Sequence, residues 1–290
     1  MDDIIIVGSG PAGISASLYI KRAGLSVKVI GKDGGSLEKA DKIQNYFGLE
    51  KALSGSELIQ IGIKQAKELG VEIITEEVLD ISYADEGFEV SVKSDTYKAS
   101  AVLLATGAAR KAPRIEGLVQ FEGMGVSYCA VCDGFFYRGK EVAVLGSSEY
   151  ALHEVKELLP IASKVSVLTN GVEPDADFPA GVEVYKAKIS KLFGAEVLEG
   201  AQFSDGAALR FNGLFIAVGS AAAGDLARKL GANVVDNKIS VNADMETNIP
   251  GLYAAGDCTG GIMQVSTAVA EGARAALSAI DYVRKKKKSK

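Results

Sequence analysis

Two cysteines separated by two residues are the part of this chain whose residue types point most directly to chemistry. Cys129 and Cys132 lie in the run Tyr128-Cys-Ala-Val-Cys-Asp-Gly134, and Asp133 directly follows the second cysteine. Thiol–disulfide exchange needs an attacking thiolate, a leaving thiolate and a nearby proton carrier. A close cysteine pair supplies both sulfurs, and the adjacent carboxyl can give or take the proton. The run therefore predicts a redox-active disulfide.

Half of a zinc site is the alternative interpretation of the same pair. A structural zinc site usually repeats the cysteine pair. The other candidate ligands, His153 and Cys258, each occur singly and far from the pair in sequence. We therefore favour redox chemistry and predict no bound metal.

A glycine-rich loop near the amino terminus indicates a nucleotide. Ile4–Val7 reads as a buried strand, Gly8–Gly13 follows with the pattern G-x-G-x-x-G, and an apolar helix continues to Ala23. In this setting the first glycine permits a tight turn, the second lets the backbone approach a pyrophosphate, and the third lets helix and strand pack closely. The helix amino terminus then faces the phosphates. A tight strand–helix turn without a ligand is the alternative.

The second strand departs from the dinucleotide pattern. It runs from Ser26 to Ile30 and should end in an acid that binds the adenosine ribose. Gly31 and Lys32 follow instead, and Asp33 comes two or three positions late.

Length and composition indicate a two-domain α/β protein. The chain has 290 residues, 48% hydrophobic content, 33 glycines, three cysteines and a net charge of −5. These values suggest about two domains with many βα turns, no disulfide scaffold and no general affinity for nucleic acid. The uncharged stretch 4–20 contains three glycines and a proline, so it reads as strand plus helix and not as a membrane span. We expect a cytoplasmic protein.

Further elements follow from hydrophobic periodicity and from turn residues. The predicted helices are 56–69 and 264–282, and the predicted strands are 71–75, 89–93, 96–99, 100–105, 141–145 and 252–255. A short linker with a proline at 111–116 marks a candidate domain boundary, and the chain is expected to cross back near 245–252.

Taken together, the motifs resemble the low-molecular-weight thioredoxin reductase family over nearly the whole chain. They are Gly8–Gly13, Gly34-Gly35 with Asn45, Ala105–Gly107, Cys129–Gly134, and Gly256-Asp257 with Gln264. The resemblance implies two Rossmann-like three-layer α/β domains. Residues 1–112 and 245–290 would form a split FAD domain, and residues 113–244 would form the domain that carries the cysteines.

The resemblance also implies site residues and a homodimer. The FAD contacts would be Gly8, Ser9, Gly10, Pro11, Ala12, Gly13, Ser36, Asn45, Val78, Thr106, Gly107, Asp257, Gln264 and Val265. Cys132 would face the flavin, Cys129 would attack thioredoxin, and Asp133 would carry the proton. A rotation of the middle domain would bring the cysteine pair to the flavin and to thioredoxin in turn. Met263 stands where the family usually has arginine.

The middle domain departs from the family where NADPH should bind. The expected G-x-G-x-x-A reads Gly146-Ser-Ser-Glu-Tyr-Ala151, so Ser148 replaces the second glycine and Glu149 adds negative charge. After the strand 164–168 the family motif His-Arg-Arg is replaced by Thr169-Asn-Gly-Val-Glu173, which leaves no cationic fork for a 2′-phosphate. An NADPH site with unusual ligands is the alternative.

These losses make the chain similar to the ferredoxin-dependent flavin thioredoxin reductases, which implies reduced ferredoxin as the electron donor. Ferredoxins are generally acidic and need a basic docking surface. The run Arg284–Lys290 is a candidate, although a solvated, disordered tail is the preferred interpretation of it. Two other functions stay open: a reductase fed by NADPH or by another flavoprotein, and a non-catalytic redox-sensing flavoprotein.

Overall fold

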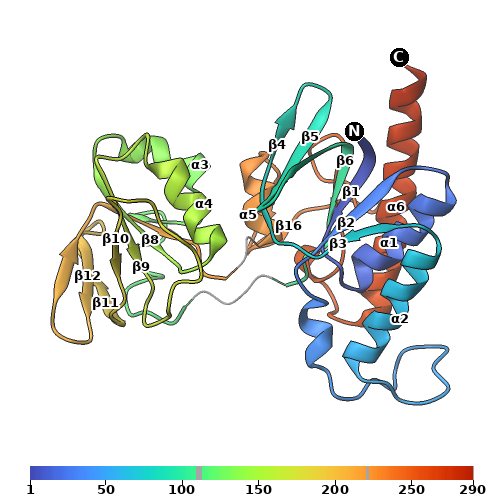
Figure 1. The fold of residues 1–290 in the computed structure, drawn as a ribbon, viewed down its shortest axis with the longest axis horizontal. Helices are drawn as coiled ribbons and strands as arrows, with labels where there is room; N and C mark the ends of the chain where they lie inside the picture. The colour runs from blue at the N-terminus through green and yellow to red at the C-terminus, as the bar shows by residue number, and fades with distance from the viewer. Residues whose placement is uncertain (109–112, 220–221, 290) are drawn as a thin grey trace. The chain divides into compact units, whose positions relative to one another are not determined.

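The computed structural model describes residues 1–108, 113–219 and 222–289. The chain divides into two compact units: residues 1–109 together with 222–290, and residues 110–221. Each unit is built on a mainly parallel sheet (Figure 1), so the predicted α/β class with two Rossmann-type domains is confirmed. The predicted linker begins at Lys111 and Ala112, which lie outside the described residues.

The first unit has a seven-stranded sheet in the order β3-β2-β1-β6-β5-β4, with β17 also paired to β6. Its strands are β1 (Asp2–Val7), β2 (Val27–Ile30), β3 (Glu72–Ile74), β4 (Val78–Ala84), β5 (Gly87–Val92), β6 (Thr96–Leu104) and β17 (Leu252–Ala254). β1, β2, β3, β6 and β17 are parallel, and β4 and β5 are antiparallel additions. The two strands predicted within 96–105 are one continuous strand, β6.

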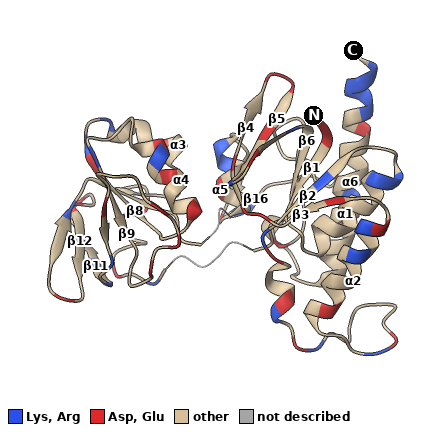
Figure 2. Ribbon diagram, viewed as in Figure 1, with Lys and Arg blue, Asp and Glu red and all other residues tan. Residues whose placement is uncertain are grey.

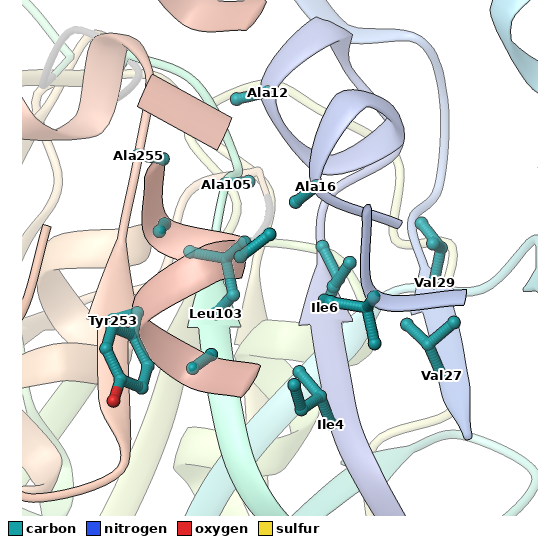
Figure 3. Close-up of a cluster of buried hydrophobic side chains, with 14 of the residues drawn as sticks. Ile4, Ile6, Ala12, Ala16, Val27, Val29, Leu103, Ala105, Tyr253 and Ala255 are labelled. Atoms are coloured by element: carbon teal, nitrogen blue, oxygen red, sulfur yellow. The ribbon is translucent and has the colours of Figure 1, made fainter. Parts of the chain in front are cut away.

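Three helices, α1 (Pro11–Arg22), α2 (Gly55–Glu68) and α6 (Val265–Lys288), lie along one face of this sheet (Figure 1). Two short 3₁₀ turns, η1 (Gly35–Lys39) and η3 (Asp257–Thr259), join elements of the unit. Figure 3 shows Ile4 and Ile6 of β1 pointing toward Leu103 of β6 and Ala16 of α1. Each fully buried side chain of this size contributes roughly 1.5–3 kcal/mol. No helix in the described parts of the chain is long and apolar enough to cross a membrane.

The chain returns to the first unit at Ala222, earlier than the predicted crossing at 245. The intervening residues form α5 (Ala223–Lys229), β15 (Val234–Val235) and β16 (Lys238–Ile239). Tyr83 of β4 donates a hydrogen bond to the Leu230 carbonyl at 2.6 Å, and Lys229 pairs with Asp80 at 3.1 Å. These contacts attach α5 to the first unit, so the predicted boundary was too late.

The basic run at the carboxyl end is helical through Lys288, which corrects the expectation of a disordered tail. Val283 is fully buried, so the apolar face of α6 continues into the run. Arg284 bonds the Ala23 carbonyl, Lys286 bonds the Glu86 carbonyl and Lys287 pairs with Asp3. The cations also lie at the carboxyl end of the helix dipole, where they are favourable.

The second unit has a five-stranded parallel sheet in the order β10-β9-β8-β14-β7. Its strands are β7 (Val126–Ser127), β8 (Glu141–Leu145), β9 (Lys164–Leu168), β10 (Glu183–Tyr185) and β14 (Gly213–Ile216). A smaller antiparallel sheet contains β11 (Ile189–Phe193), β12 (Gly200–Phe203) and β13 (Ala208–Arg210). The helices are α3 (Ala130–Asp133) and α4 (Glu149–Leu158), with a 3₁₀ turn η2 (Gly134–Tyr137) after α3.

Candidate active site

Cys129 and Cys132 form a disulfide, with their Cα atoms 5.3 Å apart. The pair starts α3: Cys129 is the residue before the helix, and its sulfur accepts a hydrogen bond from the Cys132 N–H at 3.1 Å. Cys129 is 3% exposed, whereas Cys132 is exposed. The helical turn therefore presents one sulfur-bearing residue at the surface and keeps the other inside the unit.

Ser127, at the end of β7, connects the disulfide to Asp133. Its hydroxyl donates to Asp133 Oδ2 at 2.6 Å and accepts from the Cys129 N–H at 3.1 Å. Ser127 is 6% exposed; its bond from Cys129 is buried and its bond to Asp133 is partly buried. The sequence analysis did not identify this residue. The only signal was a hydroxyl residue at the end of a short apolar strand, immediately before the cysteine run.

The residues predicted to bind FAD all lie in the first unit, and several of them meet at one edge of its sheet. In register, Val7 of β1 lies beside Leu104 of β6, which lies beside Ala254 of β17. Because these strands are parallel, the segments that follow them leave the same edge of the sheet. These segments hold the predicted residues Gly8 to Gly13, Thr106 and Gly107, and Asp257.

The glycines of the loop between β1 and α1 are needed for two reasons: Gly8 and Gly13 for packing, and Gly10 for access by a ligand. A Cβ on Gly8 would lie 2.2 Å from the Ala105 carbonyl, and one on Gly13 would lie 2.0 Å from the Gly8 carbonyl. A Cβ on Gly10 would meet only the Gly34 carbonyl, at 4.0 Å. The protein itself therefore leaves open space in front of Gly10, which fits the approach of a pyrophosphate to the backbone. Among the residues that the structure describes, no side chain caps α1, so its first N–H groups are available to a ligand.

Asp33, the acid that comes later than the dinucleotide pattern requires, forms hydrogen bonds within the turn after β2. Ser9 donates to the Asp33 carbonyl at 2.8 Å, and the Asp33 carboxylate accepts from the Gly35 N–H at 2.9 Å. This turn leads into η1, which carries the exposed Ser36. Val78, the remaining predicted contact of this region, is buried at the start of β4.

The predicted ring end of the flavin site is built from distant segments. Asn45 Nδ2 donates to Gln264 Oε1 at 2.9 Å, just before Val265 begins α6. Burial raises the pKa of Asp257 above its usual value. The Glu271 carboxylate accepts from the Gly256 N–H at 2.8 Å, which holds the turn that carries Asp257. Sequence reasoning missed Glu271, because its partner lies on another element.

At the corresponding edge of the second unit, the residues that replace the dinucleotide-binding pattern bond to other residues of that unit. Gly146 is needed for packing, since a Cβ there would lie 2.2 Å from the Ala217 carbonyl. Ser148 is buried and donates to the Gly219 carbonyl at 2.8 Å, and the Ser147 carbonyl accepts from the Asp175 N–H at 2.9 Å. The turn before α4 is therefore bonded to two neighbouring loops.

The segment after β9 is likewise engaged in internal contacts. Asn170 Oδ1 accepts from the Ile189 N–H at 2.8 Å, and Glu173 pairs with Lys186 at 2.6 Å. Lys186 thus already has an acidic partner, while the stem of Lys188 packs beside Gly171. A phosphate would meet the Glu173 carboxylate here and lysines, and not the arginine fork of the family motif.

No group of three or more metal-binding side chains occurs within the described ranges. Cys258, one of the candidate zinc ligands, is buried, and burial raises the pKa of its thiol to about 12. Its sulfur donates to the carbonyls of Ala255 and Leu104 at 3.3 and 3.5 Å. It is a small residue packed against the carboxyl ends of β6 and β17.

Comparison with known proteins agrees with this arrangement. The family model described as pyridine nucleotide-disulphide oxidoreductase matches residues 2–272. A thioredoxin reductase of Ureaplasma parvum is 31% identical over 97% of this chain and 96% of its own, and one of Listeria monocytogenes is 32% identical over 99% and 95%. Each relative is matched along nearly its whole length.

Two solved structures are also similar. The atypical thioredoxin reductase TRi of Desulfovibrio vulgaris Hildenborough has a TM-score of 0.93 and 38% identity, with 98% of this chain and 99% of that one covered. A ferredoxin-flavin thioredoxin reductase of Clostridium acetobutylicum has a TM-score of 0.73 and 35% identity, with 98% of each covered. With the cysteine pair and the glycine-lined sheet edge in place, the chain belongs to the thioredoxin reductase family of flavin-dependent disulfide oxidoreductases.

Proposed function

We propose that this enzyme reduces thioredoxin through the Cys129–Cys132 disulfide with electrons from reduced ferredoxin and not from NADPH. The observation that carries the choice of donor is the turn before α4, where the residues of the NADPH pattern are replaced and bonded internally. Ser148, in place of a glycine, is bonded to Gly219, and the acidic Glu149 begins α4. Asn170 and Glu173 offer no cation to a 2′-phosphate. Similarity to a structure titled ferredoxin-flavin thioredoxin reductase supports the same choice.

FAD is the cofactor that the family implies, and the first unit fits it. When bound, a flavin exchanges electrons singly or in pairs, which lets a one-electron donor serve a two-electron disulfide. The open space at Gly10 would take the pyrophosphate, with Ser9, Pro11, Ala12 and Gly13 beside it. Asp257 would accept a hydrogen bond from a ribityl hydroxyl, and the amino end of α6 would direct N–H groups toward the ring.

The remaining chemistry belongs to the cysteine pair and Asp133. Once the disulfide is reduced, Cys129 attacks the disulfide of thioredoxin, and Cys132 then resolves the mixed disulfide. Because Cys129 is buried in the disulfide form, its sulfur must become accessible after the bond opens. Asp133, held by Ser127, moves the proton that accompanies these steps.

The surface around Cys132 suits a protein substrate. Val131, Phe135 and Phe136 are 51%, 67% and 68% exposed, and all three lie within four residues of Cys132 in sequence. Exposed apolar side chains of this size that gather beside a reactive group are typical of protein interaction sites.

The basic run at the end of α6 is a poor site for electron transfer. α6 has 24 residues. At a rise of 1.5 Å per residue, its last turn lies about 36 Å from Gln264, where the flavin ring is expected. A donor must bring its own cofactor close to the ring, so we propose that ferredoxin docks elsewhere on the first unit.

Anaerobic stopped-flow spectroscopy tests the proposal by following flavin reduction with each donor. Reduced ferredoxin is expected to bleach the flavin quickly, and NADPH to bleach it slowly or not at all even at millimolar concentration. Cys132→Ser, which keeps the FAD site, should still be bleached by ferredoxin but should not turn over thioredoxin. Fast bleaching by NADPH, or none by ferredoxin, favours a reductase fed by NADPH or by another flavoprotein.

A further inference from the structure

A buried carboxylate lies directly behind the disulfide. Glu154, on α4, is 1% exposed, and its Oε2 accepts a hydrogen bond from the Ala130 N–H at 2.8 Å. Ala130 is the first residue of α3 and is joined by a peptide bond to Cys129. Burying a carboxylate is costly unless strong hydrogen bonds offset the loss of water. The position therefore differs from the solvated glutamates usual on a surface helix.

The covalent path fixes how near this charge lies to sulfur. From Glu154 Oε2 the path runs through the Ala130 nitrogen and the Cys129 Cα to the sulfur. With standard bond lengths and the observed hydrogen bond, the separation is at most about 8 Å. Two like charges at this distance in a partly buried site disfavour each other enough to change a pKa by about one unit.

We propose that Glu154 is a positioning residue that holds the first turn of α3 and, through its charge, disfavours the Cys129 thiolate in the reduced pair. A dithiol whose thiolate is less stable is a stronger reductant, because its oxidation removes the unfavourable charge. The inference rests on the proposed redox role of the cysteine pair. Electrons and protons balance in the step that it affects: the two thiols lose two electrons and two protons as they become a disulfide, and the partner's disulfide takes up both to become two thiols.

Other titratable groups lie on α4 and on the elements that it packs against. The latter carry Asp133 on α3, Glu141 at the start of β8 and Lys164 at the start of β9, and α4 itself carries Glu149, Tyr150, His153, Lys156 and Glu157. Tyr137 on η2 is a further group, and its pKa is raised by burial and then by the Asp133 charge. Glu154 is distinguished from the other carboxylates of this set by its burial and by its bond to α3.

Glu154→Gln removes the negative charge but keeps the hydrogen bond, since the amide oxygen of glutamine can still accept from the Ala130 N–H. The full-length, FAD-loaded protein is compared in a Cys132→Ser background, where Cys129 is the one remaining thiol of the pair. Cys258 is the other thiol, and burial, which raises its pKa to about 12, keeps it protonated over the range used. The ultraviolet absorbance of its thiolate is followed against pH. Glu157→Gln, one turn along the same helix and partly exposed, is the matched control. The expected result is a midpoint lower by about one unit in Glu154→Gln and unchanged in Glu157→Gln.

With both cysteines present, Glu154→Gln should also make the disulfide easier to reduce in a glutathione equilibrium. A midpoint unchanged in Glu154→Gln overturns the proposal, even if the variant is less stable to heat. Glu154→Asp withdraws the charge by one methylene and should give an intermediate midpoint, so it decides the question if the glutamine variant does not fold. Neither measurement uses ferredoxin or thioredoxin, so failure of the proposed electron donor leaves this test unaffected.

Discussion

At the scale of single residues, Ser127 is the side chain that fixes Asp133 relative to the disulfide. Ser127→Ala removes the donor of the 2.6 Å bond and leaves Asp133 free to turn toward solvent. A hydrogen bond to a charged group contributes about 1.5–3 kcal/mol, so we expect thioredoxin turnover to fall about tenfold or more. Flavin content should stay normal. Ser163→Ala, at an exposed serine of the same unit, is the control, and equal turnover in both variants would remove Ser127 from the site.

Cys258 is expected to be chemically silent in the folded protein. Burial raises the pKa of its thiol to about 12, so little thiolate is present at mildly alkaline pH. After reduction, iodoacetamide should label Cys129 and Cys132 in the native state and Cys258 only in denaturant, as read by mass spectrometry. Because the folded pKa exceeds the unfolded value of 9.0, this thiol should lower stability as pH rises above 9.0. Native labelling of Cys258 would contradict its placement.

At the scale of elements, Gly10 and Gly13 of the β1–α1 turn are predicted to be required for different reasons, ligand binding and packing. Gly10→Val is expected to fold and to lose FAD, because its side chain would enter only open space. Gly13→Ala should instead destabilise the fold by about 1–3 kcal/mol or more, since its Cβ would lie 2.0 Å from a carbonyl oxygen. Flavin absorbance and urea unfolding of the apoprotein measure the two effects. A full complement of flavin in Gly10→Val would refute the pyrophosphate assignment.

Elements could be predicted from the sequence where the pattern that specifies them lies within the element itself. The β1–α1 turn was predictable because its glycines and apolar runs stand side by side, and Glu141–Leu145 is a strand as predicted. The boundary near 245 was wrong because α5 is attached to β4 by Lys229 and Tyr83, a pairing across distant segments that leaves no local pattern. The helical tail was missed because four lysines concealed the apolar periodicity that buries Val283.

Within the candidate site the same distinction holds. Cys129, Cys132 and Asp133 lie within five consecutive residues, so the disulfide could be predicted directly from the sequence. Glu154 could not be distinguished from a surface glutamate, because it lies in a charged helix and its partner Ala130 lies on another element. Several of the predicted FAD residues, Gly8 to Gly13, Thr106, Gly107 and Asp257, come to one sheet edge through the pairing of β1, β6 and β17.

At the scale of the whole molecule, the distribution of charge offers the end of α6 as a candidate surface for an acidic donor. Figure 2 shows Lys and Arg gathered on the last turns of α6. Because this end lies about 36 Å from the amino end of α6, reversing charge there should not slow electron delivery. We expect Lys285→Glu with Lys288→Glu to leave the rate of flavin reduction by ferredoxin unchanged. In both proteins that rate should fall as salt is added, since exposed charges are screened within about 10 Å at 0.1 M salt. A slower variant at low salt would show that the run is the dock.

The split of the first unit has a consequence for how the protein is made. β1, α1 and β6 are synthesised first, but β17 and α6, which pack against β6 and α1, come from the last part of the chain. At about 5–20 residues per second, the ribosome needs roughly ten to thirty seconds to add the missing elements. The inserted unit, residues 110–221, is complete well before then.

During that interval the nascent amino-terminal half has an apolar sheet face that its own α1 and α2 cover only in part, because α6 has not yet been made. We expect a chain halted after residue 221 to contain a protease-resistant second unit and a protease-sensitive first half, which limited proteolysis with mass spectrometry would show. Resistance of both halves would mean that the first half folds alone. If the first half stays unfolded, its apolar surface is exposed to aggregation until α6 emerges from the ribosome. The need for a chaperone then follows from the order in which the two units are synthesised.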